Sequence, residues 1–282
     1  LAGMTETPIV IVLAQRPGPA TGLPTRTAQG DLLFAVNAGH GEFAKMVIAP
    51  SDPKDAFHCV VRAFNIADKY QIPVIVLTDQ LMADAGFSIN HLEPERSQPE
   101  FALADPSQFS QYRRYRVTEG GISPRLYPGQ SEHLVGADSD EHDELGHITE
   151  DLAGTAVVMA EKRQKKAQIL RKEVGTPHEM RLQDAEVVFV GWGSSRNAVS
   201  EAVDMLRKDG VKAGMIHFTE LWPLPTYSFS NAKRYWSVEG NATGQFARLL
   251  RSEFGLAFDG HIGRYDGLPV TATYIRSHFN ER

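Results

Sequence analysis

The sequence predicts an α/β protein with two open, mostly parallel sheets in two domains. Short apolar segments rich in Val and Ile, typical of strands in parallel sheets, alternate with segments whose apolar residues recur at helical spacing. This alternation occurs twice, over residues 9–79 and residues 187–254, and a polar helical stretch separates the two regions. Alternating strands and helices imply parallel pairing with right-handed crossovers, and 282 residues suffice for two modest domains.

The first domain is expected over residues 1–148, as an α/β domain. Its first strand, Ile9–Ala14, is an unbroken apolar run, so we predict that it is buried on both faces. A helix beginning near Asp31 and a short strand at Met46–Ala49 follow it.

The next helix is predicted to begin at Ser51–Pro53, because a side-chain oxygen can cap a first turn and proline is suited to it. Strand Val74–Leu77 follows, and residues 84–148 then form a long irregular segment, of a kind that is usually functional or wrapped on a partner. The predicted core face of the helix consists of Phe57, Val60, Val61, Phe64, Ala67 and Tyr70.

Residues 149–176 are predicted to form a linker helix, and residues 177–282 a second α/β domain. The charged run Glu161–Lys166 is interpreted as the solvated face of the linker helix rather than a nucleic-acid site. The expected elements of the second domain are strand Val187–Val190, helix Asn197–Leu206, strand Val211–Phe218, strand Tyr235–Val238 and helix Phe246–Phe254.

Composition excludes several functions. A formal net charge of -6 argues against binding to nucleic acid. No apolar run approaches the ~20 residues that cross a bilayer, and no signal peptide is evident, so we expect a cytoplasmic protein without a membrane contact. The single cysteine, Cys59, cannot form a disulfide within the chain or hold an iron–sulfur cluster, which needs about four thiolates. Because it lies in a helical pattern, we expect a buried, inert thiol.

The loop after the first strand is the strongest candidate site. Arg16 stands at the carboxyl end of the strand, where open α/β sheets bind ligands, and a loop rich in Gly and Pro follows it. A guanidinium there can bind a carboxylate or phosphate through two parallel hydrogen bonds, or it can simply face water in an ordinary turn. Thr25 follows nine residues later, and its hydroxyl can reach the same anion if the loop folds back.

Gly191-Trp-Gly-Ser-Ser-Arg196 follows a strand and opens a helix, as dinucleotide-binding loops do. The third glycine of that pattern is replaced by Arg196, so the close approach of helix and strand is not provided for. An NAD(P) site is therefore a minor alternative, and an anion at the helix N-terminus remains open.

Two histidine-containing segments have several interpretations. Glu141–His147 contains His142 and carries imidazoles and carboxylates, which suit divalent metals, but the spacing matches no zinc motif. It is either a solvated acidic loop or a loop that reaches an active site, and we predict no metal. His40, in Gly39-His-Gly41, is either a surface residue of a turn or a substrate-binding residue.

A series of short motifs extends in order over nearly the whole chain. They are residues 1–8, 15–31, 63–67 and 73–79, then Gly121–Arg125, Glu141–His147, Val190–Ser194, Leu221–Pro223, Val238–Asn241 with Gly244-Gln245, and Tyr265–Pro269. Together they resemble the α subunit of thiamine-diphosphate-dependent 2-oxoacid:ferredoxin oxidoreductases, the 2-oxoglutarate and pyruvate synthase family.

This resemblance implies that residues 1–148 are a partial domain of the type that binds the pyrimidine of thiamine, and that residues 177–282 resemble the C-terminal domain of transketolase. It also implies oxidative decarboxylation of a 2-oxoacid, 2-oxoglutarate or pyruvate, to acyl-CoA, with electrons passed to ferredoxin. It assigns substrate contacts to Arg16 and Thr25 and suggests further contacts at His40 and His142. It also implies a β subunit, in a hetero-oligomer, that holds a [4Fe-4S] cluster and shares thiamine diphosphate and Mg with this chain. The magnesium-binding pattern Gly-Asp-Gly with a later Asn is absent here, in agreement with that division.

The chain departs from the family at its start. The earlier segment, with a Tyr-Pro-Ile-Thr-Pro motif and the glutamate that activates the aminopyrimidine, is missing from this sequence. We therefore expect a truncated or processed α subunit whose activity requires the partner and that upstream segment. A non-catalytic interaction or assembly subunit is the first alternative, and an NAD(P)-dependent dehydrogenase is the second.

Overall fold

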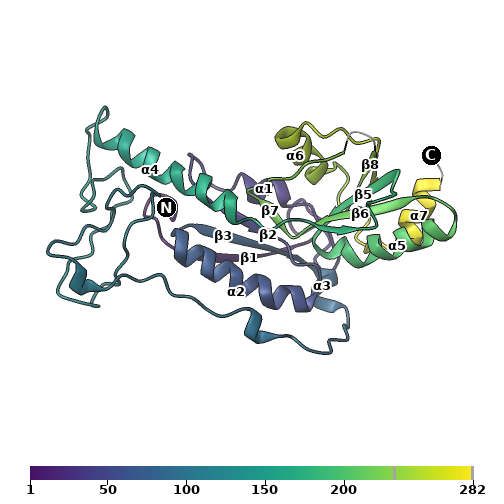
Figure 1. The fold of residues 1–282 in the computed structure, drawn as a ribbon, viewed down its shortest axis with the longest axis horizontal. Coiled ribbons are helices and arrows are strands. Elements are labelled where there is room, and N and C mark those ends of the chain that lie inside the picture. Colours follow the sequence, from purple (N-terminus) through teal and green to yellow (C-terminus); the bar gives the residue numbers. More distant parts are fainter. Residues whose placement is uncertain (231–232, 281–282) are drawn as a thin grey trace.

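The computed structural model describes residues 1–230 and 233–280, which form two open sheets lying one after the other along the molecule (Figure 1). The first sheet has the order β1-β3-β2-β7. Its parallel strands are β1 (Ile9–Gln15), β3 (Pro73–Asp79) and β2 (Met46–Ile48), and β7 (Glu220–Trp222) pairs antiparallel with β2. Because β7 comes from the second half of the chain, that half completes the first sheet.

The second sheet has the order β4-β6-β5-β8-β9. All its pairs are parallel except the one between β4 and β6, and the chain moves outward from β5 in both directions. The strands are β4 (His178–Met180), β5 (Val187–Trp192), β6 (Ala213–Phe218), β8 (Arg234–Glu239) and β9 (Gly260–Gly263). The fold class predicted from the sequence is confirmed.

Three apolar cores hold helices on both faces of the two sheets. One core is continuous between the sheets and includes α1 and α6, a second lies under α5 and α7, and the third lies under α2. None of the helices in the described part of the chain is long and apolar enough to cross a membrane. The helices are α1 (Leu32–Val36), α2 (Pro53–Tyr70), α3 (Gln80–Asp84), α4 (Thr155–Leu170), α5 (Arg196–Lys208), α6 (Gln245–Phe254) and α7 (Ala272–Asn280), with single 3-10 turns at Pro94–Arg96, Pro106–Gln108, Arg171–Glu173 and Gly193–Ser195.

The prediction that β1 is buried on both faces is wrong. Within the described residues β1 pairs with β3 alone, so it is an edge strand. Ile11 and Val12 are 43% and 63% exposed. An apolar run shows that a strand can be buried, but burial on both faces also requires neighbours, which the sequence pattern cannot place.

The core face predicted for α2 is largely wrong. The helix begins as expected, with Asp52 accepting a hydrogen bond from the Asp55 amide at 2.8 Å. Ala67 and Tyr70 are buried as predicted, but Val60 and Phe64 are exposed, because another apolar stripe of the helix packs on the sheet. The packed residues are Cys59, Ala63, Ile66, Ala67 and Tyr70.

Cys59 is buried and unpaired, and burial raises the pKa of its thiol far above the ordinary value, which confirms the predicted inert state.

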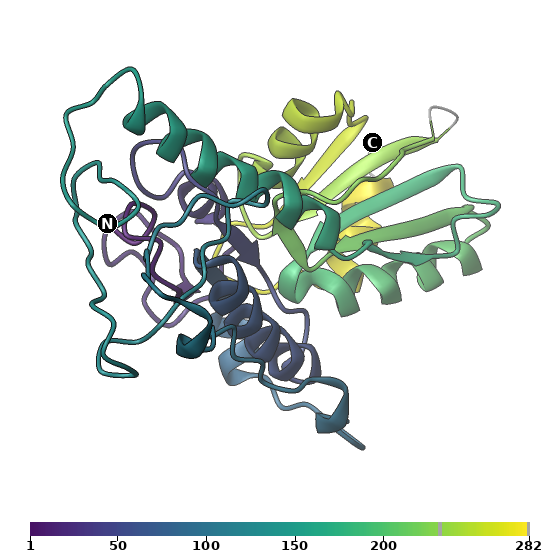
Figure 2. The same cartoon turned by 60° about the vertical axis from the view of Figure 1, so that its left-hand side comes forward.

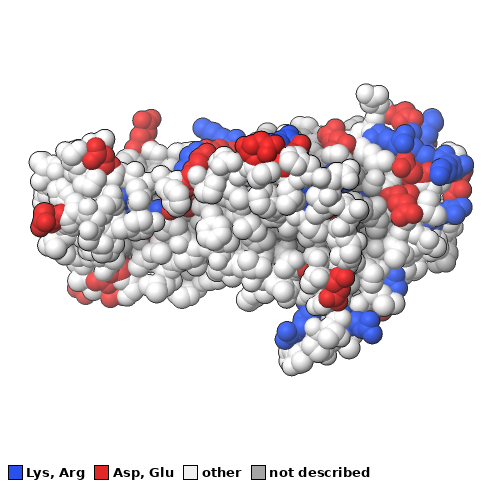
Figure 3. Space-filling view, turned by 90° about the horizontal axis from the view of Figure 1, so that it is seen from below, with Lys and Arg blue, Asp and Glu red and all other residues white. Residues whose placement is uncertain are grey.

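The face of the molecule seen in Figure 3 carries few charged side chains across its middle. Many of the charged side chains in this view gather at the end that holds the second sheet.

The interpretation of α4 as a solvated helix is wrong. The helix runs beside the first sheet and ends near the second (Figures 1 and 2), and its charged residues Lys162, Arg163 and Lys166 are buried. Lys162 binds one carboxylate oxygen of Glu6 at 2.5 Å, and Lys166 binds the other. Burial alone would raise the pKa of Glu6, but the two ammonium groups hold it below its ordinary value, whereas burial lowers the pKa of Lys166 to about 8.

Residues 84–148 are irregular, as expected, but much of the segment packs on this chain's own first domain. Arg114 donates to the side chain of Gln71 and to the Glu6 carbonyl, both at 2.7 Å, and Arg125 pairs with Asp68 of α2. The segment therefore covers α2 and the amino end of the first sheet.

Candidate functional site

The loop that carries Arg16 leaves the first sheet where the carboxyl ends of two parallel strands lie side by side. Gln15, the last residue of β1, pairs in register with Asp79, the last residue of β3. The Gln15 side chain accepts a hydrogen bond from the Asp31 amide at 3.1 Å, so the two ends of the loop are held together. This edge is the place where open α/β sheets bind ligands.

The loop folds back on itself. The Leu23 amide donates to the Pro17 carbonyl at 3.0 Å, which places Arg16 and Thr25 just outside this closure, one on each side. Both side chains are exposed. Burial raises the pKa of the Asp31 carboxyl, and the nearby positive charge of Arg16 partly opposes that rise. The structure therefore brings Arg16 and Thr25 onto one exposed loop.

Gly22 makes the closure possible. Its φ is +51°, and a Cβ at this position would lie 1.8 Å from the Pro17 carbonyl oxygen. We expect Gly22→Ala to open the loop, since the clash is with backbone and the conformation is one that L side chains rarely adopt. The variant should cost about 1–3 kcal/mol of stability. Thermal unfolding, with Gly30→Ala as the control because Gly30 has open space, would test this.

The second sheet binds Gln29, which lies near the end of the loop that precedes α1. Gln29 is 3% exposed and uses all four of its polar groups there. Its side chain donates to the Trp192 carbonyl and accepts from the Gly240 amide, both at 2.8 Å. Its backbone donates to the Gly240 carbonyl at 2.7 Å and accepts from the Asn241 side chain at 2.9 Å.

Glu239 fixes the residues that bind Gln29. It is fully buried, and its carboxylate accepts from the Trp192 indole at 3.2 Å, from Asn241 at 2.8 Å, and from two amides at the start of α6. The motif Glu239-Gly-Asn241 thus caps the start of α6 and binds Gln29. Sequence reasoning missed Gln29 and Asp79 because a residue's partner in another domain leaves no local pattern.

A second contact joins the carboxyl ends of the two sheets. Asp79 is 3% exposed and accepts a hydrogen bond from the Ser194 hydroxyl, and it also caps α3 through the Met82 amide at 3.1 Å. Burial raises the pKa of Asp79. The loop and both sheets therefore meet at one seam.

The structure leaves little room for the dinucleotide site considered at Gly191–Arg196. The chain diverges between β5 and β8, the position at which doubly wound sheets bind a nucleotide, but Gln29 fills this crevice. A Cβ on Gly193 would already lie 3.1 Å from the Gln29 side-chain nitrogen. The space beside Gly193 is thus occupied by Gln29 of this chain.

The structure does not bring His40 and His142 to the loop. Both lie at the amino end of the first sheet, whereas Arg16 lies at its carboxyl end. His40 is exposed beside a cavity of about 1080 Å³ formed with α4. His142 is fully buried, packs against Tyr115 with ring centroids 4.0 Å apart and the rings tilted by 43°, and leaves its Nε2 without a partner.

The acidic residues beside His142 have structural partners. Glu141 pairs with Arg163 of α4 at 2.6 Å, and Asp143 accepts from the amides of Leu145 and His147. Among the residues that the structure describes, no group of three or more His, Cys, Asp or Glu side chains could hold a metal.

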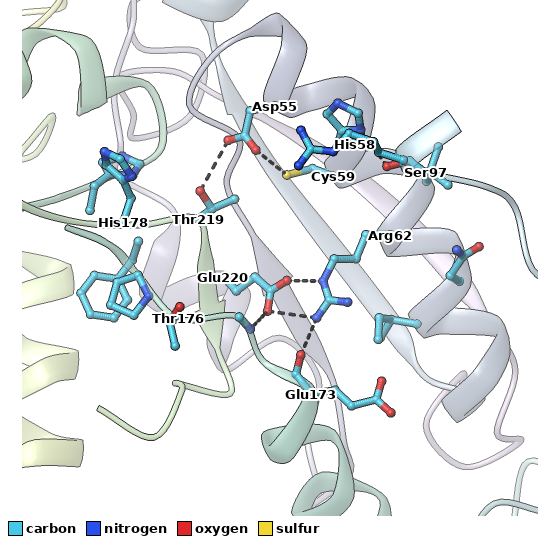
Figure 4. Close-up of a pocket in the computed structure, with 18 of the residues that line it drawn as sticks. Asp55, His58, Cys59, Arg62, Ser97, Glu173, Thr176, His178, Thr219 and Glu220 are labelled. Atoms are coloured by element: carbon cyan, nitrogen blue, oxygen red, sulfur yellow. Dashed lines mark hydrogen bonds and ion pairs between the residues drawn. The ribbon is translucent and has the colours of Figure 1, made fainter. Parts of the chain in front are cut away.

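A cavity of about 950 Å³ lies between α2 and the start of β7, and hydrogen bonds and an ion pair link its walls (Figure 4). Arg62 binds the Glu220 carboxylate and donates to the Glu173 carbonyl at 2.7 Å. Asp55 accepts from Thr219, at 3.4 Å, from across the cavity. These bonds join the two halves of the chain.

His217 lines this cavity and should make stability depend on pH. It is 1% exposed, one nitrogen bonds the Gly193 carbonyl at 2.9 Å, and burial lowers its pKa from 6.5 to about 3. Below its ordinary pKa the unfolded chain gains a proton that the folded chain does not, so stability falls as the pH drops through this window. Urea unfolding should show a loss of about 2 kcal/mol between about pH 7 and pH 5 from this residue. His217→Gln should remove that part of the slope, and an unchanged slope would contradict the assignment.

Comparisons with known proteins match most of the chain. A family model described as pyruvate flavodoxin/ferredoxin oxidoreductase, thiamine diphosphate-binding, matches residues 1–162, and one for pyruvate:ferredoxin oxidoreductase core domain II matches residues 185–249. The α subunit of 2-oxoacid:ferredoxin oxidoreductase 1 from Aeropyrum pernix is 36% identical over 95% of this chain and 43% of its own length. A 2-oxoglutarate synthase subunit, KorA, from Methanothermobacter marburgensis is 28% identical over 91% of this chain and 68% of its own length.

A solved structure shares the fold over almost the entire chain. The 2-oxoglutarate:ferredoxin oxidoreductase from Magnetococcus marinus, with 2-oxoglutarate, coenzyme A and succinyl-CoA bound, superposes with a TM-score of 0.90 and 32% identity. The match covers 99% of this chain and 49% of that one. The chain thus spans about half the length of this structure and somewhat less of the Aeropyrum relative.

Proposed function

The chain belongs to the thiamine-diphosphate-binding pyruvate flavodoxin/ferredoxin oxidoreductase family, and we propose that it forms part of the α subunit of a 2-oxoacid:ferredoxin oxidoreductase. The proposed reaction is the oxidative decarboxylation of a 2-oxoacid to an acyl-CoA, with the electrons passed to ferredoxin. The observation that carries the proposal is the closed, exposed loop with Arg16 and Thr25 at the carboxyl ends of β1 and β3.

Arg16 is proposed to bind the carboxylate of the 2-oxoacid, since a guanidinium matches it with two parallel hydrogen bonds. Thr25 is proposed to donate its hydroxyl to the same substrate, because the loop closure brings its backbone back toward Arg16. His40 and His142 lie at the other end of the sheet, so any role for them is in an interface or in the fold.

Thiamine diphosphate, when bound, supplies the carbanion chemistry of decarboxylation. The described residues offer no multidentate metal site, so we propose that Mg is held largely by the partner β subunit. With one buried cysteine in this chain, the [4Fe-4S] cluster is also assigned to that subunit.

We propose 2-oxoglutarate as the preferred substrate, with pyruvate as the alternative. The Magnetococcus enzyme binds 2-oxoglutarate, and the Methanothermobacter relative is named a 2-oxoglutarate synthase subunit. The test is reduction of a viologen dye by the full-length protein with its partner subunit, thiamine diphosphate, Mg and coenzyme A. Turnover with 2-oxoglutarate above pyruvate is expected. No turnover with any 2-oxoacid, despite a loaded cluster, would favour a non-catalytic assembly subunit.

A further inference from the structure

We propose that Gln29 is a positioning residue that sets the substrate affinity of the loop carrying Arg16 and Thr25. It does so by occupying the crevice of the second sheet. The second sheet thereby fixes one end of a binding loop whose other end begins in the first sheet. This inference rests on the proposed function, because it concerns how the same loop binds a 2-oxoacid.

The polar groups of the crevice match one side chain. It lies at the carboxyl ends of β5 and β8, where the chain diverges to the two sides of the sheet, and Gln29 is 3% exposed within it. The Trp192 carbonyl and the Gly240 amide present one acceptor and one donor, at 2.8 Å each. This pair matches a primary amide, and neither a carboxylate nor an ammonium could satisfy both.

The residues next to Gln29 are held by the same region. The Gln245 side chain donates to the Gly30 carbonyl at 2.6 Å and accepts from the Leu33 amide at 3.0 Å. The Thr27 amide donates to the Gly267 carbonyl at 3.2 Å. Thus three separate points of the second domain fix the chain between Thr27 and Leu33.

The part of the loop that carries Arg16 and Thr25 makes no such hydrogen bonds to the second domain in the described structure. From Arg16 to Arg26, the hydrogen bonds in the described structure are internal, from Leu23 to Pro17 and from Arg26 to Leu23. The position of Arg16 and Thr25 relative to the sheets therefore depends on the attachment of the loop ends. Small errors in the placement of a substrate-binding group reduce binding and rate steeply.

The experiment measures steady-state kinetics of the full-length protein with its partner subunit. Gln29→Ala leaves the Gly240 amide unpaired and removes one of the two hydrogen bonds to the Trp192 carbonyl, and we expect the KM for the 2-oxoacid to rise about tenfold. The KM for coenzyme A should stay the same and kcat should change less. In an Arg16→Ala background, Gln29→Ala should add less than about twofold, because it acts through Arg16 and Thr25.

Gln71→Ala is the matched control. Gln71 is also buried, at 2% exposed, and its side chain also makes two hydrogen bonds, to Ser123 and Arg114. It lies at the far end of the first domain, so its loss should lower the melting temperature without changing the KM for the 2-oxoacid.

Equal kinetic effects of Gln29→Ala and Gln71→Ala would overturn the inference, and so would independent, multiplying effects of Gln29→Ala and Arg16→Ala. If Gln29→Ala does not fold, Gln245→Ala removes two of the neighbouring bonds and should raise the same KM in the same direction. Absence of turnover by the wild type would refute the proposed function itself. A defect in Arg16→Ala without one in the Gln29 or Gln245 variants would refute this inference alone.

Discussion

Replacing Glu6 by Gln is expected to lower the free energy of unfolding by about 3–5 kcal/mol. Glu6 is 1% exposed, and its two carboxylate oxygens neutralise Lys162 and Lys166, which are 0% and 2% exposed. The variant would leave two buried ammonium groups without a counter-charge. Because both lysines are on α4, the helix should detach from the first domain before the rest of the chain unfolds.

Urea unfolding followed by circular dichroism measures this effect, and hydrogen exchange of α4 amides locates it. Glu186→Gln is the control, since Glu186 pairs with Lys212 on the surface, where ion pairs contribute little to stability. Equal stability of the two variants would show that the buried cluster does not hold α4.

Replacing Arg16 by Ala is expected to reduce kcat/KM for the 2-oxoacid by about 30- to 1000-fold, equivalent to about 2–4 kcal/mol. The variant removes the guanidinium at the carboxyl end of β1, which can donate two parallel, charge-assisted hydrogen bonds. The fold should tolerate the change because the side chain is exposed. Arg16→Lys should recover only part of the loss, since an ammonium keeps the charge but not the planar pair of donors.

The measurement is dye reduction by the full-length protein with its partner, with pyruvate and 2-oxoglutarate run in parallel. Arg26→Ala is the control, because Arg26 is an exposed cation on the same loop. Unchanged kinetics of Arg16→Ala with every 2-oxoacid would contradict the proposed carboxylate contact. A similar loss in Arg26→Ala would assign the effect to the net charge of the loop.

Some elements were predictable from the sequence because their signals are local. Apolar runs mark the strands at residues 9–15, 73–79 and 187–192, and Asp52 and Pro53 mark the start of α2. The fold of the Arg16 loop was also predictable, because Gly22 and Pro24 favour a turn there. Short strands such as β4 and β7 escaped prediction, because three residues show no periodicity.

The errors have a common origin. The sequence pattern identified α2 as amphipathic but chose the wrong stripe, since Val60 and Phe64 are apolar whether or not anything covers them. It placed Lys162 and Lys166 in solvent, because lysines are rarely buried without a partner and their partner, Glu6, lies about 160 positions away in the chain.

The sequence by itself thus determined the α/β class, the order of the main strands and helices, and the exposed loop with Arg16 and Thr25. These depend on propensities and periodicities within a few residues. Tertiary structure alone decided that β7 completes the first sheet, that Gln29 fills the crevice of the second, and that His40 and His142 lie away from Arg16. Such pairings arise from complementary shape and hydrogen bonding between segments that are far apart in the chain, and no local pattern records them.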